Sequence, residues 1–114
     1  MKGLQDSFKA AFRGFWRTLV FERTFKIMMS AAVLVTGAMF YLPTSRLEKI
    51  GLLTMIFAVL GLELVNSTIE KFLDFIKPEP SEKVRVIKDL MAAIVLLASL
   101  GAAVIGLIVF LPYF

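Results

Sequence analysis

The stretch IGLLTMIFAVLGLELVNSTIEKFLD, residues 50–74, joins an apolar run to a stripe of polar side chains. The polar members follow the apolar part, Ile50–Leu62, at spacings of three, four and four residues: Glu63, Asn66, Glu70 and Asp74. At about 100° per helical residue these side chains share one face, within an arc of roughly 80°. An ionisable side chain at membrane depth costs roughly 2.5–3.5 kcal/mol, so the stripe predicts cationic partners and a functional role. Three carboxylates and an amide indicate metal and phosphate chemistry at a membrane surface.

The rest of the chain is too apolar for an ordinary soluble domain, with 59% hydrophobic residues and a mean hydropathy of +0.84. The runs 27–45 and 90–114 carry no charge, and the run 50–69 carries only Glu63. Each is close to or above the roughly 20 residues that cross a bilayer, so we predict three transmembrane helices. Histidine and cysteine are absent. Acid–base and metal chemistry must therefore fall to carboxylates, which suit hard ions such as Mg²⁺.

Residues 4–21 predict an amphipathic helix that lies in the membrane interface. Its apolar face repeats at spacings of three and four (Leu4, Phe8, Phe12, Phe15 and Leu19), and its basic row is Lys9, Arg13 and Arg17. Large aromatic side chains on one face and basic ones on another are typical of an interfacial helix. Such a helix has two interpretations: an anchor that sets the topology, or a wall or gate for a lipid substrate.

Turn signals separate the predicted membrane helices, and the charges orient them. Pro43 ends the first, and Ser45–Glu48 has the Ser-x-x-Glu form of a capping box that starts the second. The segment Lys77–Pro80 contains two prolines and ends the second helix. Residues 1–26 and 71–88 are basic, which predicts that the N-terminus and the second connection face the cytoplasm. These charges flank membrane spans, so anionic headgroups explain them better than nucleic acid does.

The predicted fold is an all-α integral membrane protein with an N-terminal amphipathic surface helix and three transmembrane helices. We expect one domain over residues 1–114, with the surface helix at about 4–21 and the membrane helices at about 25–42, 46–76 and 82–111. The third membrane helix carries a small-residue stripe, Ala98, Ala102 and Gly106, which favours close helix packing. Three helices enclose little space for carboxylates, so oligomerisation would supply the missing walls.

Three blocks of this sequence resemble the prokaryotic integral-membrane diacylglycerol kinases, a family that includes the undecaprenol kinases. The segment Phe8–Gly14 is similar to the family's Phe-x-x-Ala-x-x-Gly pattern, and Glu22–Lys26 to its Glu-x-x-Phe-Arg block. The strongest block is Glu63–Asp74, which resembles Glu-x-x-Asn-[Ser/Thr]-Ala-Ile-Glu-x-x-x-Asp, followed as in the family by Pro-Glu at 78–79 and Lys-Asp at 88–89.

The resemblance implies a homotrimer that uses ATP and Mg²⁺ to phosphorylate the primary hydroxyl of a membrane lipid alcohol, either diacylglycerol or undecaprenol. By position, Glu63 would be the general base, and Glu22 and Glu70 would hold metal ions. The expected nucleotide-binding residues are Asn66, Asp74, Glu79, Lys88 and Asp89. Pro80-Ser81 and Met28-Met29 depart from the family pattern and leave the substrate preference open. The second and third blocks favour undecaprenol slightly.

Two other classes of function remain open at this point. Intramembrane carboxylates also mark ion paths, so the chain could form a small oligomeric transporter or ion-conducting protein. Against this, the apolar half of the second membrane helix and the third helix beyond Asp89 offer almost no polar side chains for a path. A membrane scaffold held by the small-residue stripe would leave Glu63 and Asn66 without a role.

Overall fold

The computed structural model describes residues 2–114, and this part of the chain is helical apart from short connections. Its elements are α1 (Lys2–Phe21), α2 (Arg23–Tyr41), α3 (Arg46–Ile76), α4 (Glu82–Phe110) and the 3₁₀ helix η1 (Leu111–Tyr113). Three helices, α2, α3 and the α4–η1 unit, are long and apolar enough to cross a membrane. The expected all-α fold with three membrane-crossing helices is therefore confirmed.

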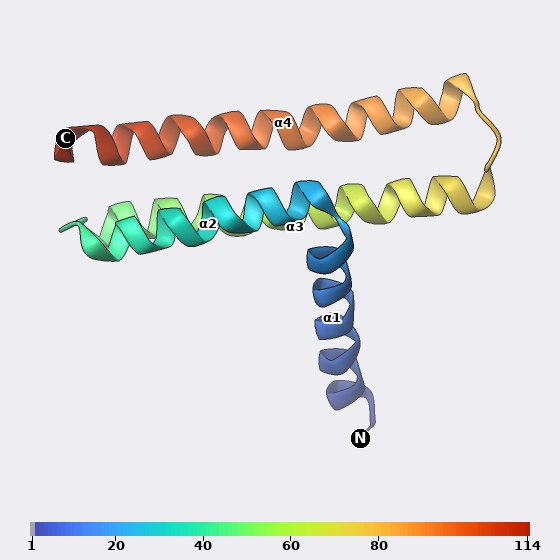
Figure 1. Ribbon diagram of the computed structural model, residues 1–114, viewed down its shortest axis with the longest axis horizontal. Coiled ribbons are helices and arrows are strands. Elements are labelled where there is room, and N and C mark those ends of the chain that lie inside the picture. Colours follow the sequence, from blue (N-terminus) through green and yellow to red (C-terminus); the bar gives the residue numbers. More distant parts are fainter. Residues whose placement is uncertain (1) are drawn as a thin grey trace.

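The helix α3 is the central element of the fold. It packs against both α2 and α4, and these three helices run alongside one another (Figure 1). A small cluster of buried side chains, Met39, Leu52 and Val109, joins the three helices at the end that holds the C-terminus. Most large apolar side chains elsewhere on the three helices are exposed, as is expected of helices that face lipid.

The start of α3 carries the predicted capping box. The Ser45 hydroxyl accepts from the Glu48 backbone N–H at 3.1 Å, and the Ser45 backbone N–H donates to the Glu48 carboxylate at 2.7 Å. The Tyr113 hydroxyl donates to the same carboxylate at 2.9 Å, and it also lies 3.2 Å from the Pro43 carbonyl oxygen. This end of the bundle is thus closed by hydrogen bonds between the C-terminal segment and the α2–α3 turn.

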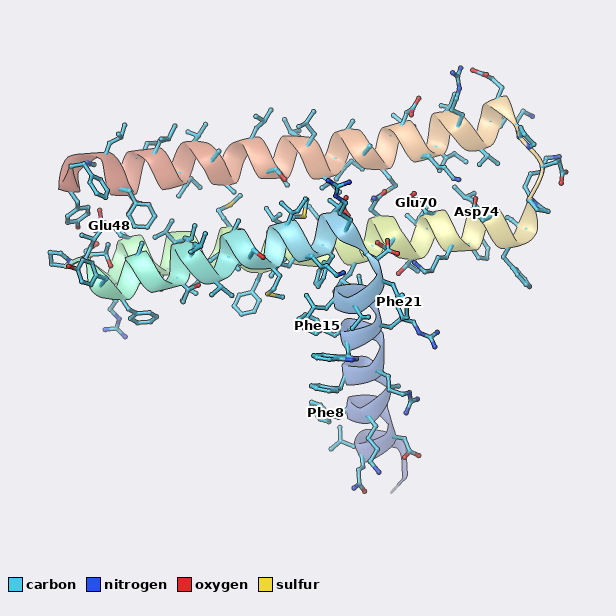
Figure 2. All side chains as sticks on the ribbon, in the orientation of Figure 1. Phe8, Phe15, Phe21, Glu48, Glu70 and Asp74 are labelled. Carbon is cyan, nitrogen blue, oxygen red and sulfur yellow. The ribbon has the colours of Figure 1, made fainter. Side chains whose placement is uncertain are left out.

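The helix α1 projects crosswise from the other three (Figure 1). Glu22 sits at the corner between α1 and α2 with extended backbone angles (φ −101°, ψ 114°). Phe15 of α1 packs edge-to-face on the fully buried Phe25 of α2, with ring centroids 5.5 Å apart. Phe8 and Phe15 project toward the side on which the C-terminal end of the bundle lies (Figure 2). The corner therefore fixes both the direction of α1 and the position of the Glu22 carboxylate.

Beyond the level of α1, α3 and α4 continue together as a helical hairpin (Figure 1). The connection between them, Lys77–Ser81, contains Pro78 and Pro80, which cannot continue a helix. This hairpin carries the charged second half of the polar stripe, whereas the part of the bundle on the other side of α1 is almost wholly apolar.

Candidate active site

The polar stripe of α3 forms a hydrogen-bonded chain at the level where α1 leaves the bundle. The Asn66 side-chain amide donates to the Glu70 carboxylate at 3.0 Å and lies 3.5 Å from the Glu63 carboxylate. Glu63 is 5% exposed even in a single chain, while Asn66 and Glu70 are half-buried. The helical spacing of three and four residues places these groups side by side, as the sequence pattern predicts.

Glu22 reaches the same face of α3 from the corner between α1 and α2. One of its carboxylate oxygens accepts from the Ser67 hydroxyl at 3.2 Å, and the other contacts the Lys71 ammonium at 3.3 Å. Ser67 is buried, and Glu22 keeps about a third of its side chain exposed. The Glu22 carboxylate thus contacts two residues that follow it in the chain by 45 and 49 positions.

Asp74 and Lys88 join the two helices of the hairpin. The Lys88 ammonium donates to the Asp74 carboxylate at 2.7 Å across the α3–α4 interface. Glu70 and Asp74 both project from α3 toward α4 (Figure 2). Asp89 follows on α4 as an exposed side chain. Glu79 lies in the α3–α4 connection, where it pairs with Lys77 at 3.3 Å, so the structure does not bring it to the carboxylate stripe.

Cations of the same chain balance only part of the negative charge of this region. Among the side chains that the structure describes, Lys71 pairs with Glu22 and Lys88 pairs with Asp74, but Glu63 and Glu70 belong to no ion pair. The Asn66 side-chain amide lies between the carboxylates of Glu63 and Glu70, so the two like charges are neighbours on α3. Buried carboxylates without a counter-ion are costly. The arrangement therefore favours the arrival of a cation from outside the chain.

The donor set fits Mg²⁺ in the way that phosphate-handling sites hold it. Within residues 2–114 no three acidic side chains converge closely enough to bind one ion by themselves. Mg²⁺, however, is usually bound by one or two carboxylates together with substrate phosphates and water. Glu70, bridged by Asn66 to the buried Glu63, and Glu22 at the corner are carboxylates of that kind.

A pocket of about 860 Å³ lies between α1 and α3 beside Glu22. Residues of α1, four phenylalanines among them, supply most of its wall, and its polar lining includes Glu22, Ser67 and Lys71. A second, smaller pocket of about 350 Å³ lies among α2, α3 and α4 and is lined almost wholly by apolar residues. The first pocket is the one that connects an apolar surface to the candidate site.

Ser67 and Lys71 are site residues that the sequence interpretation missed. They continue a row that begins at Glu63 with spacings of four, so helical periodicity alone puts them beside the polar stripe. Their contact with Glu22 depends on how α2 packs against α3, which no local pattern encodes. Helical spacing could have identified both residues as candidates for the site, but their contact with Glu22 is seen only in the packed structure.

These features define a class of protein: a helical membrane protein with a carboxylate-rich site at the base of a crosswise N-terminal helix. Residues 9–110 match the sequence profile of the family described as prokaryotic diacylglycerol kinase. An undecaprenol kinase of Bacillus subtilis (strain 168) is 33% identical over 106 residues, which cover 93% of this chain and 86% of that protein. The chain belongs to the prokaryotic diacylglycerol kinase family.

Membership of this family makes the chain a lipid kinase, which is an enzyme that moves a phosphoryl group from a nucleotide donor to a lipid. With three helices able to cross a bilayer, it is a multi-pass membrane protein. The transporter interpretation is not favoured. All the candidate site residues lie within the matched range.

Proposed function

We propose that this kinase transfers the γ-phosphoryl group of ATP, with Mg²⁺, to the primary hydroxyl of a membrane lipid alcohol at the cytoplasmic face of a bacterial inner membrane. The single observation that carries the proposal is the buried Glu63, linked through Asn66 to Glu70 at the level where α1 leaves the bundle. At that level an apolar lipid body and a charged nucleotide can meet.

Glu63 acts as the general base. Its carboxylate accepts the proton of the lipid hydroxyl while the hydroxyl oxygen attacks the γ-phosphorus, and ADP departs as the bond to its β-phosphate oxygen breaks. A base within hydrogen-bond reach of the attacking hydroxyl is sufficient, because phosphoryl transfer depends mainly on positioning and charge neutralisation. Asn66 positions the carboxylates of Glu63 and Glu70 relative to each other.

Glu22 and Glu70 would hold Mg²⁺, which on binding neutralises the developing charge on the phosphate oxygens. Lys88 carries a charge that suits phosphate, and its contact with Asp74 holds it at the α3–α4 interface. Asp74 and Asp89 are the further groups on this side of the site that would position the nucleotide. Glu79 remains a weaker candidate, since its observed partner is Lys77 in the connection.

The helix α1 lies in the membrane interface and forms one wall of the lipid site. Its crosswise direction sets it parallel to the bilayer plane when α2, α3 and α4 cross the bilayer (Figure 1). Phe8 and Phe15 then point toward the hydrocarbon (Figure 2). The pocket between α1 and α3 would take the lipid alcohol near its hydroxyl end, with the apolar chain continuing into the bilayer.

The active enzyme is a homotrimer. One chain leaves most large apolar side chains of α2, α3 and α4 uncovered, and the small-residue stripe of α4 permits close helix contact. If the site is shared between subunits, a neighbouring subunit would cover the polar surface of the α3–α4 hairpin that a single chain leaves exposed. Mixing inactive Glu63→Gln subunits with inactive Glu70→Ala subunits tests this, because activity recovers in the mixture only where one site draws on two chains.

The acceptor is undecaprenol in preference to diacylglycerol, in line with the name of the Bacillus subtilis relative. The test is transfer of labelled phosphate from ATP, with and without Mg²⁺, in mixed micelles that offer both lipids. We expect product mainly on undecaprenol, no product without a divalent cation, and about 100-fold less product, or lower still, from Glu63→Gln. Product mainly on diacylglycerol would overturn the choice of lipid, and full transfer in the presence of a chelator would overturn the role of the metal.

A further inference from the structure

We infer that Lys71 is a counter-ion that competes with the divalent cation for the Glu22 carboxylate and thereby sets the metal concentration that the enzyme requires. The inference rests on the proposed function, because it takes Glu22 to be a metal ligand. It concerns a residue with no role in the mechanism proposed above.

Lys71 is in direct contact with the Glu22 carboxylate. Its ammonium lies 3.3 Å from one Glu22 oxygen, while the Ser67 hydroxyl lies 3.2 Å from the other, so both oxygens of the carboxylate have a donor. Lys71 also lines the pocket between α1 and α3, together with Glu22 and Ser67. Ser67 is a neutral donor and leaves the carboxylate charge intact, whereas Lys71 offsets it.

The ion pair is of a kind that can exchange. The Lys71 side chain is 63% exposed, and surface ion pairs of this sort contribute little to folding. Lys88 differs in that its own side chain is 34% exposed, while its partner Asp74, 2.7 Å away, is the exposed member of the pair at 65%. The Lys71 ammonium can therefore leave Glu22 while the protein stays folded. Its long side chain can then turn the charged end into the adjacent water.

The sign of the effect follows from Coulomb's law. An ammonium in contact with a carboxylate reduces the attraction of that carboxylate for a second cation. Removal of the ammonium leaves Glu22 with its full charge, so a divalent ion should bind more tightly. We expect a change of about threefold, within the factor of roughly 1.5 to 5 that exposed ion pairs are worth.

The test measures metal binding without turnover. Mn²⁺ binding to the full chain in detergent, with a non-hydrolysable ATP analogue present, is followed by electron paramagnetic resonance for wild type, Lys71→Met and Lys71→Gln. Lys71→Met keeps the apolar stem and removes the charge. The dissociation constant for Mn²⁺ should fall about threefold in both variants. In the transfer assay the half-saturating Mg²⁺ concentration should fall by a similar factor.

Two variants serve as matched controls. Lys71→Arg retains the positive charge and should bind Mn²⁺ as wild type does. Lys77→Met removes a lysine that also lies 3.3 Å from a glutamate, Glu79, but in the α3–α4 connection, and its Mn²⁺ constant should not change. An unchanged or weaker Mn²⁺ affinity in both Lys71→Met and Lys71→Gln overturns the inference, because Lys71 would then be neutral or would help to hold the ligand.

Glu22→Gln separates failure of this inference from failure of the proposed function. If Glu22→Gln weakens Mn²⁺ binding while the Lys71 variants have no effect, only the competition is wrong. If Glu22→Gln leaves Mn²⁺ binding unchanged, Glu22 is not a metal ligand and both statements fail. In the Glu22→Gln background, Lys71→Met should produce no further change, since the two side chains act through one contact.

Discussion

Glu48 near the start of α3 and Glu63 in its second half are carboxylates of one helix in opposite surroundings. Glu48 receives hydrogen bonds from the Ser45 backbone and from Tyr113, so its own chain satisfies it. Glu63 is buried beside Asn66 and has the carboxylate Glu70 as a neighbour instead of a cation. A glutamate of this helix with complete internal partners serves the fold, whereas one with incomplete partners is available to a ligand.

The largest expected effect is the loss of phosphoryl transfer when Glu63 is replaced, compared with the same replacement at Glu48. Glu63→Gln should reduce phosphoryl transfer by about 100-fold or more, since general bases contribute roughly 10²–10⁴ in rate. Its thermal unfolding midpoint should stay unchanged or rise, because a buried charge is removed. Glu48→Gln is the matched control, and it should lower the unfolding midpoint while leaving the turnover number near wild type.

The assay for this pair is transfer from labelled ATP together with thermal unfolding in the same detergent. A Glu63→Gln enzyme with near-normal turnover would contradict the assignment of the general base. A Glu48→Gln enzyme that is stable but inactive would break the comparison itself.

A smaller effect is expected at the residue that joins the two functional carboxylates. Asn66→Ala removes the donor to Glu63 and Glu70 and should reduce turnover about tenfold, in line with a hydrogen bond to a charged group. The matched control is Thr36→Ala on α2, whose hydroxyl donates to the Ala32 carbonyl of the preceding turn and which does not line the α1–α3 pocket. Steady-state kinetics at several Mg²⁺ concentrations measure both variants, and equal losses in the two would show that the amide has no special role.

At the structural end of the bundle the expected change is in stability alone. Ser45→Ala removes the side-chain half of the capping box and should lower the free energy of unfolding by about 1 kcal/mol. Because Ser45 precedes Glu63 by about five helical turns of α3, turnover of the folded enzyme should not change. Denaturant unfolding and the transfer assay check the two statements, and a parallel loss of activity would mean that the two ends are coupled.

The smallest effect is expected at the ion pair between Lys77 and Glu79 in the α3–α4 connection. Lys77→Met should change the free energy of unfolding by less than about 0.5 kcal/mol, because both partners are exposed. A nucleotide KM close to wild type is also expected. A large rise in that KM would instead assign the connection to the nucleotide site and would strengthen the case for Glu79.

The sequence predicts the helical architecture well because its signals are local. Charge-free runs mark the membrane-crossing helices, and the Ser45–Glu48 pattern predicts the capping box that the structure contains. The polar stripe of α3 is also local, since helical spacing alone puts Glu63, Asn66 and Glu70 on one face. In each case the residues that interact are a few positions apart in the chain.

The contacts that the sequence could not predict join distant segments. Ser67 and Lys71 meet Glu22 because α2 packs on α3 in one register, and the pairing spans more than 40 residues. The partner of Glu48 on the C-terminal segment, Tyr113, has the same origin, as it lies 65 residues away. Glu79 is predicted to contact the nucleotide because of its place in a motif; it pairs with Lys77 in the α3–α4 connection, and its nucleotide role stays a prediction.

The crosswise direction of α1 has a consequence for the kinetics of the proposed reaction. The lipid would diffuse to the α1–α3 pocket within the two dimensions of the bilayer, while the nucleotide would approach the protruding hairpin from water (Figure 1). Neither route crosses the other, so a ternary complex can assemble in either order. The rate should then follow the mole fraction of acceptor in the membrane, independent of its bulk concentration, and dilution with inert lipid should slow the enzyme at constant ATP.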